Sequence, residues 1–337
     1  MQLSELWFVL VAVLFAVFVL LEGFDFGVGM STKFLAKNES EKRVLINSIG
    51  PFWDANEVWL LTAGGAMFAA FPHWYATLFS GYYIPFVALL LCLIARGVSF
   101  EFRGKVQAEK WTKVWDWAIF LGSLLPPFLL GVLFSSLIKG LPIDADMNMH
   151  AGFFDVVNIY TVVGGLAFVM LAFMHGLMFI SLKTDGSLRD RAKQMAMKMY
   201  IATAVVIVLF VGLTAFFTDA YTDRGTILIP LYIVAILLYL LLFRFLRNSK
   251  EGFSFATTGI IMIMVTVSFF IALFPNVLIS STDITNNLTV YNAASGHYSL
   301  KLMTIVALTM VPIVLAYTIW SYYVFRRRVT DKEHLEY

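Results

Sequence analysis

The stretch SIGPFWDANEVWLLTAGG, residues 48–65, places Asp54 and Glu57 just after a Gly-Pro pair, in a chain that consists mostly of hydrocarbon side chains. Of the 337 residues, 60% are hydrophobic, 16% are aromatic and 14% are charged. A soluble domain usually carries about 25% charged residues. This composition is typical of a protein that lies in a lipid bilayer, so the two acidic residues of this stretch need a reason to be there.

Nine runs of the sequence are long and apolar enough to cross a membrane, which takes about 20 mostly apolar residues. They lie near residues 6–30, 46–71, 74–100, 113–137, 158–182, 198–218, 226–246, 253–274 and 302–325. The segments between them are too short to fold as separate domains. The sequence therefore predicts an all-α polytopic membrane protein with nine transmembrane helices, in which residues 1–337 form a single membrane domain.

The distribution of basic residues predicts how the chain is oriented, because Lys and Arg favour cytoplasmic loops. If the segment after the first run is cytoplasmic, most of the 24 Lys and Arg residues, Lys332 included, fall on the cytoplasmic side. Only Lys139, Arg224 and Lys301 fall outside, and Arg96 falls within the third run. The prediction is an external N-terminus and a cytoplasmic C-terminus.

Two pairs of acidic residues lie inside the first two runs at i, i+3 spacing: Glu22 with Asp25, and Asp54 with Glu57. This spacing projects both members of a pair from one helix face. At about 1.5 Å per residue, Asp25 and Glu22 are expected roughly 7 and 12 Å from the cytoplasmic end of their helix, at the level that Arg96 approaches. Membrane carboxyls that hold and release protons are what a proton path uses, so the four acids are predicted to form one, with Arg96 as their charge partner.

The same residues could instead form a structural polar network that ties three helices together. Pro51 is expected to interrupt its helix, because proline has no N–H to donate. Gly23 and Gly27, spaced as small-xxx-small, are expected to let two helices approach closely. Neither pattern by itself decides between a proton path and a structural network.

Other site types find little support in the sequence. A single cysteine, Cys92, excludes a disulfide framework and a CxxC metal site. His175 lies in an apolar run but has no second histidine at matching depth for a bis-histidine haem site, so it is expected to be bonded inside the bundle. His334 and the other histidines lie outside the apolar runs. The net charge of +2 and the scattered basic residues exclude nucleic-acid binding.

Four blocks of the sequence, in order, resemble subunit II of the bacterial cytochrome bd quinol oxidases. They are EGFDFGVGM (22–30), RVLINSIGPFWDANEVWLLTAGGAMFAAFP (43–72), WDWAIFLGSLLPP (115–127) and TMVPIVLAYTIWSYYV (309–324). The resemblance implies two four-helix bundles plus one peripheral helix, in the cell membrane of a bacterium. Asp54 and Asp25 match acidic residues of the family, whereas Glu22 stands where relatives have aspartate.

The resemblance also implies a division of labour within a complex that reduces oxygen to water with electrons from quinol. Haems b and d are expected on a partner, subunit I, and none on this chain. This chain is expected to scaffold subunit I and to supply part of the proton route from the cytoplasm. A structural quinone and a small single-helix subunit are further expected components. A proton-coupled secondary transporter and a purely structural subunit stay as alternatives, although the acids all lie in the first runs rather than in two related halves.

Overall fold

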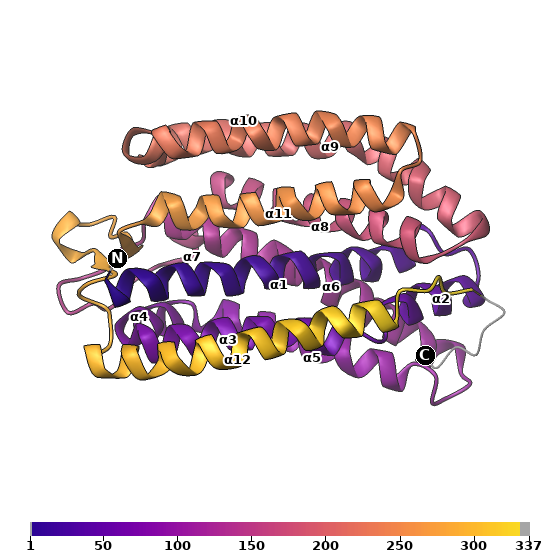
Figure 1. Ribbon diagram of the computed structural model, residues 1–337, viewed down its shortest axis with the longest axis horizontal. Coiled ribbons are helices and arrows are strands. Elements are labelled where there is room, and N and C mark those ends of the chain that lie inside the picture. Colours follow the sequence, from indigo (N-terminus) through magenta and orange to yellow (C-terminus); the bar gives the residue numbers. More distant parts are fainter. Residues whose placement is uncertain (1, 331–337) are drawn as a thin grey trace.

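The computed structural model describes residues 2–330, and within them the chain is almost entirely helical (Figure 1). Lys332 and His334, named above, lie outside the described residues. The helices are α1 (Leu3–Phe34), α2 (Glu39–Ile49), α3 (Trp53–Ala70), α4 (Pro72–Gly81), α5 (Tyr83–Phe102), α6 (Glu109–Lys139), α7 (Phe153–Val156), α8 (Ile159–Lys183), α9 (Gly186–Phe217), α10 (Ala220–Arg247), α11 (Glu251–Leu273) and α12 (His297–Val324). Strands β1 (Asn276–Leu278) and β2 (Leu288–Thr289) pair antiparallel around a short 3₁₀ turn, Ile284–Asn286.

Eight of the described helices are long and apolar enough to cross a membrane: α1, α5, α6, α8, α9, α10, α11 and α12. They run roughly along the long axis of the molecule (Figure 1). Helix α3, at the position of the predicted second span, is not among the eight. It has 18 residues, and Asp54, Asn56 and Glu57 near its start lower its hydropathy. Asp54 and Glu57, the acidic residues of possible functional interest, therefore also lower the hydropathy by which a transmembrane helix is recognised.

The predicted helix at 46–71 is divided in the structure. Helix α2 ends at Ile49 and α3 begins at Trp53, so residues 50–52 form a turn between two helices. Pro51 explains the turn, because its ring removes the backbone donor that would continue the helix to the carbonyl of Asn47. The expected interruption at Pro51 is confirmed.

The predicted helix at 74–100 is also divided, and here the sequence prediction of one continuous helix is wrong. Helix α4 ends at Gly81 and α5 begins at Tyr83, with Tyr82 between them at φ −101° and ψ 23°. Pro85 gives the physical reason, because it has no N–H to donate to the carbonyl of Gly81. Aliphatic and aromatic side chains continue through the break, so hydropathy alone does not reveal it.

Two helices extend well past their predicted apolar runs. Helix α1 ends at Phe34 instead of residue 30, and α9 begins at Gly186 instead of residue 198. Polar turns can continue a helix beyond the hydrocarbon, and a search for apolar runs does not count them. Because α1 is longer, Asp25 and Glu22 lie about 14 and 18 Å from its end, deeper than expected.

Helix α1 is the centre of the packing, in contact with α3, α6, α8 and α11. Its closest approach is to α8: a Cβ added at Gly27 would lie 2.2 Å from the carbonyl oxygen of Ala172 and 2.6 Å from Cα of Gly176. Only glycine permits this backbone contact. Gly23 faces the Met262 side chain of α11. The packing expected for the Gly23–Gly27 pattern is confirmed.

Helices α10 and α12 leave most of their apolar side chains uncovered. In α12 only Leu300 is buried, and side chains such as Leu308 and Ile319 are strongly exposed. Figure 1 shows α12 at one edge of the molecule and the α9–α10 pair at the opposite edge. Surfaces of this kind are stable against lipid tails or the apolar face of another membrane chain.

Candidate functional site: a buried carboxylate cluster

Helices α1, α3 and α5 bring three carboxyl groups and one guanidinium together inside the bundle. Glu22, Asp25 and Arg96 have no solvent exposure. Nη2 of Arg96 contacts Oε1 of Glu22 and lies 3.3 Å from Oε1 of Glu57. The side chain of Glu57 is 19% exposed, so this residue joins the buried group to the surface of the chain. We call these four residues the carboxylate cluster.

Local packing fixes Arg96 in this position. A Cβ added at Gly122 of α6 would lie 2.7 Å from Cβ of Arg96, so α6 presses directly on this turn of α5 and excludes water there. The ring of Phe26, one residue after Asp25, lies 4.7 Å from Cζ of Arg96. A guanidinium over an aromatic face is attracted by the ring quadrupole. Arg96 is thus held by charge on one side and by an aromatic ring on another.

Asn56 and Tyr322 belong to the site, although the sequence analysis did not single them out. Nδ2 of Asn56 donates to Oδ2 of Asp25 at 2.7 Å, and the hydroxyl of Tyr322 donates to Oδ1 of Asn56 at 2.9 Å. Asn56 is an amide within a largely apolar segment, and its place in WDANE (53–57) could have indicated a buried polar contact. Tyr322 lies 266 residues further along the chain, and no local pattern connects it to α3.

Asp54 lies apart from the carboxylate cluster. It is exposed in the first turn of α3, whereas Glu57, three residues later, points toward Arg96. Residues three apart on a helix differ by about 60° around its axis, so one can face inward while the other faces outward. Of the four predicted acids the structure thus brings together Glu22, Asp25 and Glu57, and leaves Asp54 at the surface.

Asp116 marks a second group of charges, at the end of the bundle that holds α2. It pairs with Lys42 and accepts from Nε of Arg103 at 2.7 Å, while Arg103 forms a bidentate pair with Glu39 at 2.6 and 2.8 Å. These pairs tie α2, α5 and α6 to one another. Glu101, by contrast, is exposed.

Several polar atoms of the carboxylate cluster make no hydrogen bond to the described part of the chain, although they are shielded from solvent. They are Oε2 of Glu22, Oδ1 of Asp25, and Nε and Nη1 of Arg96. Buried polar groups without partners are costly, so the carboxyl oxygens favour water or a proton as a partner, and the guanidinium nitrogens favour an acceptor such as water. Three carboxyls also face a single guanidinium, and an excess of buried negative charge is strongly unfavourable. Oε2 of Glu22 and Oδ1 of Asp25 are thus oxygens at which a proton could be accommodated.

His175 is fully buried and bonded at both ring nitrogens. Nε2 donates to the carbonyl of Leu20 at 3.2 Å, and Nδ1 accepts from the Thr258 hydroxyl at 2.8 Å. The ring stacks on Phe255 at a centroid distance of 4.5 Å. The expectation of a bonded, bundle-facing His175 is confirmed, and neither nitrogen is available to a haem iron. Among residues 2–330, no three His, Cys, Asp or Glu side chains are grouped as metal ligands.

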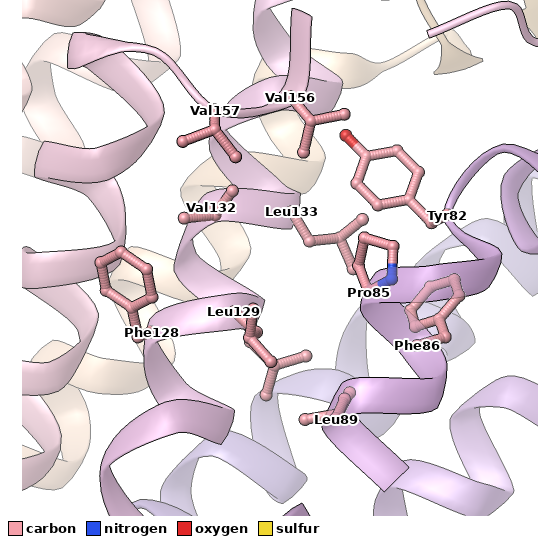
Figure 2. A pocket seen from close by; sticks show the side chains of 11 residues that line it. Tyr82, Pro85, Phe86, Leu89, Phe128, Leu129, Val132, Leu133, Val156 and Val157 are labelled. Carbon is pink, nitrogen blue, oxygen red and sulfur yellow. The ribbon is translucent and has the colours of Figure 1, made fainter. Parts of the chain in front are cut away.

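A small apolar cavity lies between α5, α6 and the residues around α7 (Figure 2). Its volume is about 80 Å³. Its lining is Tyr82, Pro85, Phe86, Leu89, Phe128, Leu129, Leu130, Val132, Leu133, Val156 and Val157. The hydroxyl of Tyr82 is bonded to Ser136. The cavity shares no residue with the carboxylate cluster and offers no charged group to a ligand.

Comparisons with known proteins relate this chain to one family. The family described as cytochrome bd terminal oxidase subunit II matches residues 3–325. Cytochrome bd ubiquinol oxidase subunit 2 of Bacillus subtilis is 57% identical over 336 residues, which is 100% of this chain and 99% of that protein. Cytochrome bd-I ubiquinol oxidase subunit 2 of Escherichia coli K12 is 34% identical over 367 residues, 99% of this chain and 97% of that protein.

A solved structure shares the fold. A chain of the bd oxidase from Geobacillus thermodenitrificans superimposes with a TM-score of 0.78 at 15% identity, covering 96% of this chain and 97% of that one. The eight apolar helices, together with the match to a membrane oxidase family, show a membrane-integral protein. Since both the family description and the relatives extend over essentially the whole length, the chain belongs to the cytochrome bd terminal oxidase subunit II family.

Proposed function

We propose that this chain is the haem-free subunit II of a quinol:oxygen oxidoreductase, and that its carboxylate cluster carries protons from the cytoplasm toward the haem-bearing subunit I. The observation that carries the proton path is the burial of three carboxyls around one arginine in membrane helices. Haems b and d belong on subunit I in this proposal, because both nitrogens of His175 are already bonded within this chain. A structural quinone and a small single-helix subunit stay predictions for the complex.

The order of the path follows from exposure. Glu22 and Asp25 are fully buried and would store protons, with Arg96 balancing the charge of the group. Glu57 is partly exposed and connects this store to the surface of α3. Asp54, exposed on the same helix, would receive the proton where the chain meets subunit I. An acidic side chain on a membrane helix is expensive against lipid, which favours a protein partner at this place.

We propose α3 as the ninth transmembrane helix, because it packs along α1 despite its polar start. The nine helices would form two four-helix bundles plus one peripheral helix. The N-terminus is placed outside and the C-terminus in the cytoplasm. This orientation is supported by the basic residues at the α2 end of the bundle, among them Lys42, Arg103 and Arg189.

The experiment that tests the proton path uses Asp25→Asn and Asp54→Asn in the whole complex, because each change removes a titratable proton and nearly keeps the shape. Quinol-dependent oxygen uptake and charge movement should fall by about 10²-fold, as for loss of a proton-transfer group. The haem spectrum and the subunit ratio should stay normal. Glu101→Gln, at an exposed position of α5, is the matched control and should leave turnover unchanged.

Two outcomes would contradict the path. If the haem spectrum collapses together with activity, the cluster is a structural network, the alternative that the sequence leaves open. If turnover is unchanged in both variants, protons enter by another route. The family relationship already removes support from the transporter alternative.

A further inference from the structure

An amide that is fixed at both ends connects the terminal helix α12 to Asp25. Asn56 is 1% exposed. Its Nδ2 also lies 3.5 Å from the carbonyl oxygen of Leu21, which can only accept a hydrogen bond. Nδ2 is therefore the donor to the Asp25 carboxyl, and Oδ1 is the acceptor for the Tyr322 hydroxyl. The Tyr322 hydroxyl therefore sets how Asn56 presents its donor to Asp25.

The same bonds distinguish the two oxygens of Asp25. Oδ2 accepts from Asn56, whereas Oδ1 accepts from no donor among the described residues, and the Asp25 carboxyl also lies in hydrogen-bond contact with the Glu22 carboxyl. A carboxyl whose one oxygen is occupied by an N–H donor carries its proton on the other oxygen. When Asp25 is protonated, the donor from Asn56 would thus favour the proton on Oδ1.

Tyr322 is held in place by more than its hydroxyl. Its ring stacks on Phe52 with centroids 4.4 Å apart and planes at 13°, and meets the edge of Phe24 at 6.3 Å. Just beyond α12, Nζ of Lys183 donates to the carbonyls of Phe325 and Arg327, the latter at 2.7 Å. Removing the hydroxyl alone should therefore leave the ring and the end of α12 where they are.

The rest of α12 has few contacts with this chain. Its other polar contact with the bundle is at the far end, where Nε1 of Trp7 donates to the carbonyl of Leu300 at 3.2 Å and to the Thr304 hydroxyl at 3.0 Å. Between these two ends the apolar side chains are exposed. Tyr322 therefore supplies the hydrogen bond that links α12, by way of Asn56, to the carboxylate cluster.

We infer that Tyr322 and Asn56 are positioning residues, which orient the Asp25 carboxyl and make the geometry of the proton path depend on the placement of α12. The inference rests on the proton path proposed above. The other charged groups near Asp25 are Glu22 of the same helix, Glu57 of α3 and Arg96 of α5. None of these three is hydrogen-bonded to Asn56 in the described structure, so the direct polar contact of Asn56 with the carboxylate cluster is the one with Asp25.

The test compares Tyr322→Phe, Asn56→Ala and the double variant in the intact complex, with Tyr323→Phe as control, since Tyr323 is 62% exposed. The carboxyl band of Asp25 in redox-induced infrared difference spectra is identified by its loss in Asp25→Asn. In Tyr322→Phe this band should shift and oxygen uptake should slow by about two- to tenfold, as for loss of one hydrogen bond. Because both residues act through one amide, the double variant should be no slower than Asn56→Ala alone.

An unmoved Asp25 band in Tyr322→Phe, or effects that multiply in the double variant, would overturn the inference. If Tyr322→Phe does not assemble, Asn56→Ala gives the same infrared comparison from the other side of the bond. The two proposals can fail separately. Unchanged turnover in both Asp25→Asn and Asp54→Asn refutes the proton path, and the infrared band then decides alone whether Tyr322 positions Asp25.

Discussion

Replacing Arg96 by glutamine removes the cation that contacts Glu22 and Glu57. Arg96 and Glu22 are both fully buried, whereas Glu57 is partly exposed and can still be hydrated. Most of the penalty therefore falls on Glu22, which is left as a buried carboxyl without its charge partner. Breaking a buried pair in this way costs about 3–5 kcal/mol. We expect the Arg96→Gln complex to be clearly less stable than the wild type.

The assay is thermal unfolding of the purified complex, followed by loss of haem absorbance. Adding Glu22→Gln to Arg96→Gln should recover most of the lost stability, because two neutral amides of similar shape then replace the ion pair. Lys113→Gln is the control: it removes the exposed Lys113–Glu109 pair of α6 and should change nothing measurable. A double variant as unstable as Arg96→Gln alone would refute the reasoning, since the loss would then not arise from the unpaired charge.

Three further changes test other parts of the structure. Gly27→Ala forces a methyl group against the α8 backbone and should cost about 1–3 kcal/mol, whereas Gly212→Ala, with open space around it, should not; equal losses of thermal stability would contradict the packing. Lys183→Met removes the donor to the segment after α12 and should speed tryptic cleavage there, and an unchanged rate would mean that these bonds do not hold the segment. The hydrogen bond from His150 holds the pKa of Asp144 below its usual range. Its contribution to loop order is therefore present above the ordinary aspartate pKa of about 3.9 and is lost as the pH falls through the lowered value. Amide exchange in this loop should accelerate only on such acidification, and Asp144→Ala should show fast exchange already at neutral pH, so slow exchange in that variant would count against the contact.

The helical fold was largely predictable, because a membrane helix must be continuously apolar and this pattern is local. The break at Tyr82 was not predicted, because the apolar pattern continues through it and only the missing donor of Pro85 marks it. The polar first turns of α9 were missed for the opposite reason: they are helical without being apolar. Hydropathy thus predicts which segments lie in lipid. It does not predict helix ends, because these depend on backbone hydrogen bonding.

The candidate site was predictable only where its residues share a helix face. The i, i+3 spacing of Glu22 and Asp25 correctly indicated a common face, and the same rule suggested a common face for Asp54 and Glu57, which the structure does not show. Which side of α3 faces inward depends on how it packs against α1. Tyr322 could not be found at all, since its contact joins segments 266 residues apart.

The carboxylate cluster combines tight helix packing around it with incomplete hydrogen bonding within it. A buried ion pair is a poor way to stabilise a fold, because well-packed apolar side chains serve as well or better. The carboxylate cluster is nevertheless surrounded by closely packed helices: α1 contacts the α8 backbone at Gly27, and α6 contacts Arg96 at Gly122. Within that frame Oε2 of Glu22 and Oδ1 of Asp25 are left unbonded by the described protein. Stability alone does not favour a tightly packed frame around charges whose oxygens are left unbonded, whereas the proposed proton path requires one.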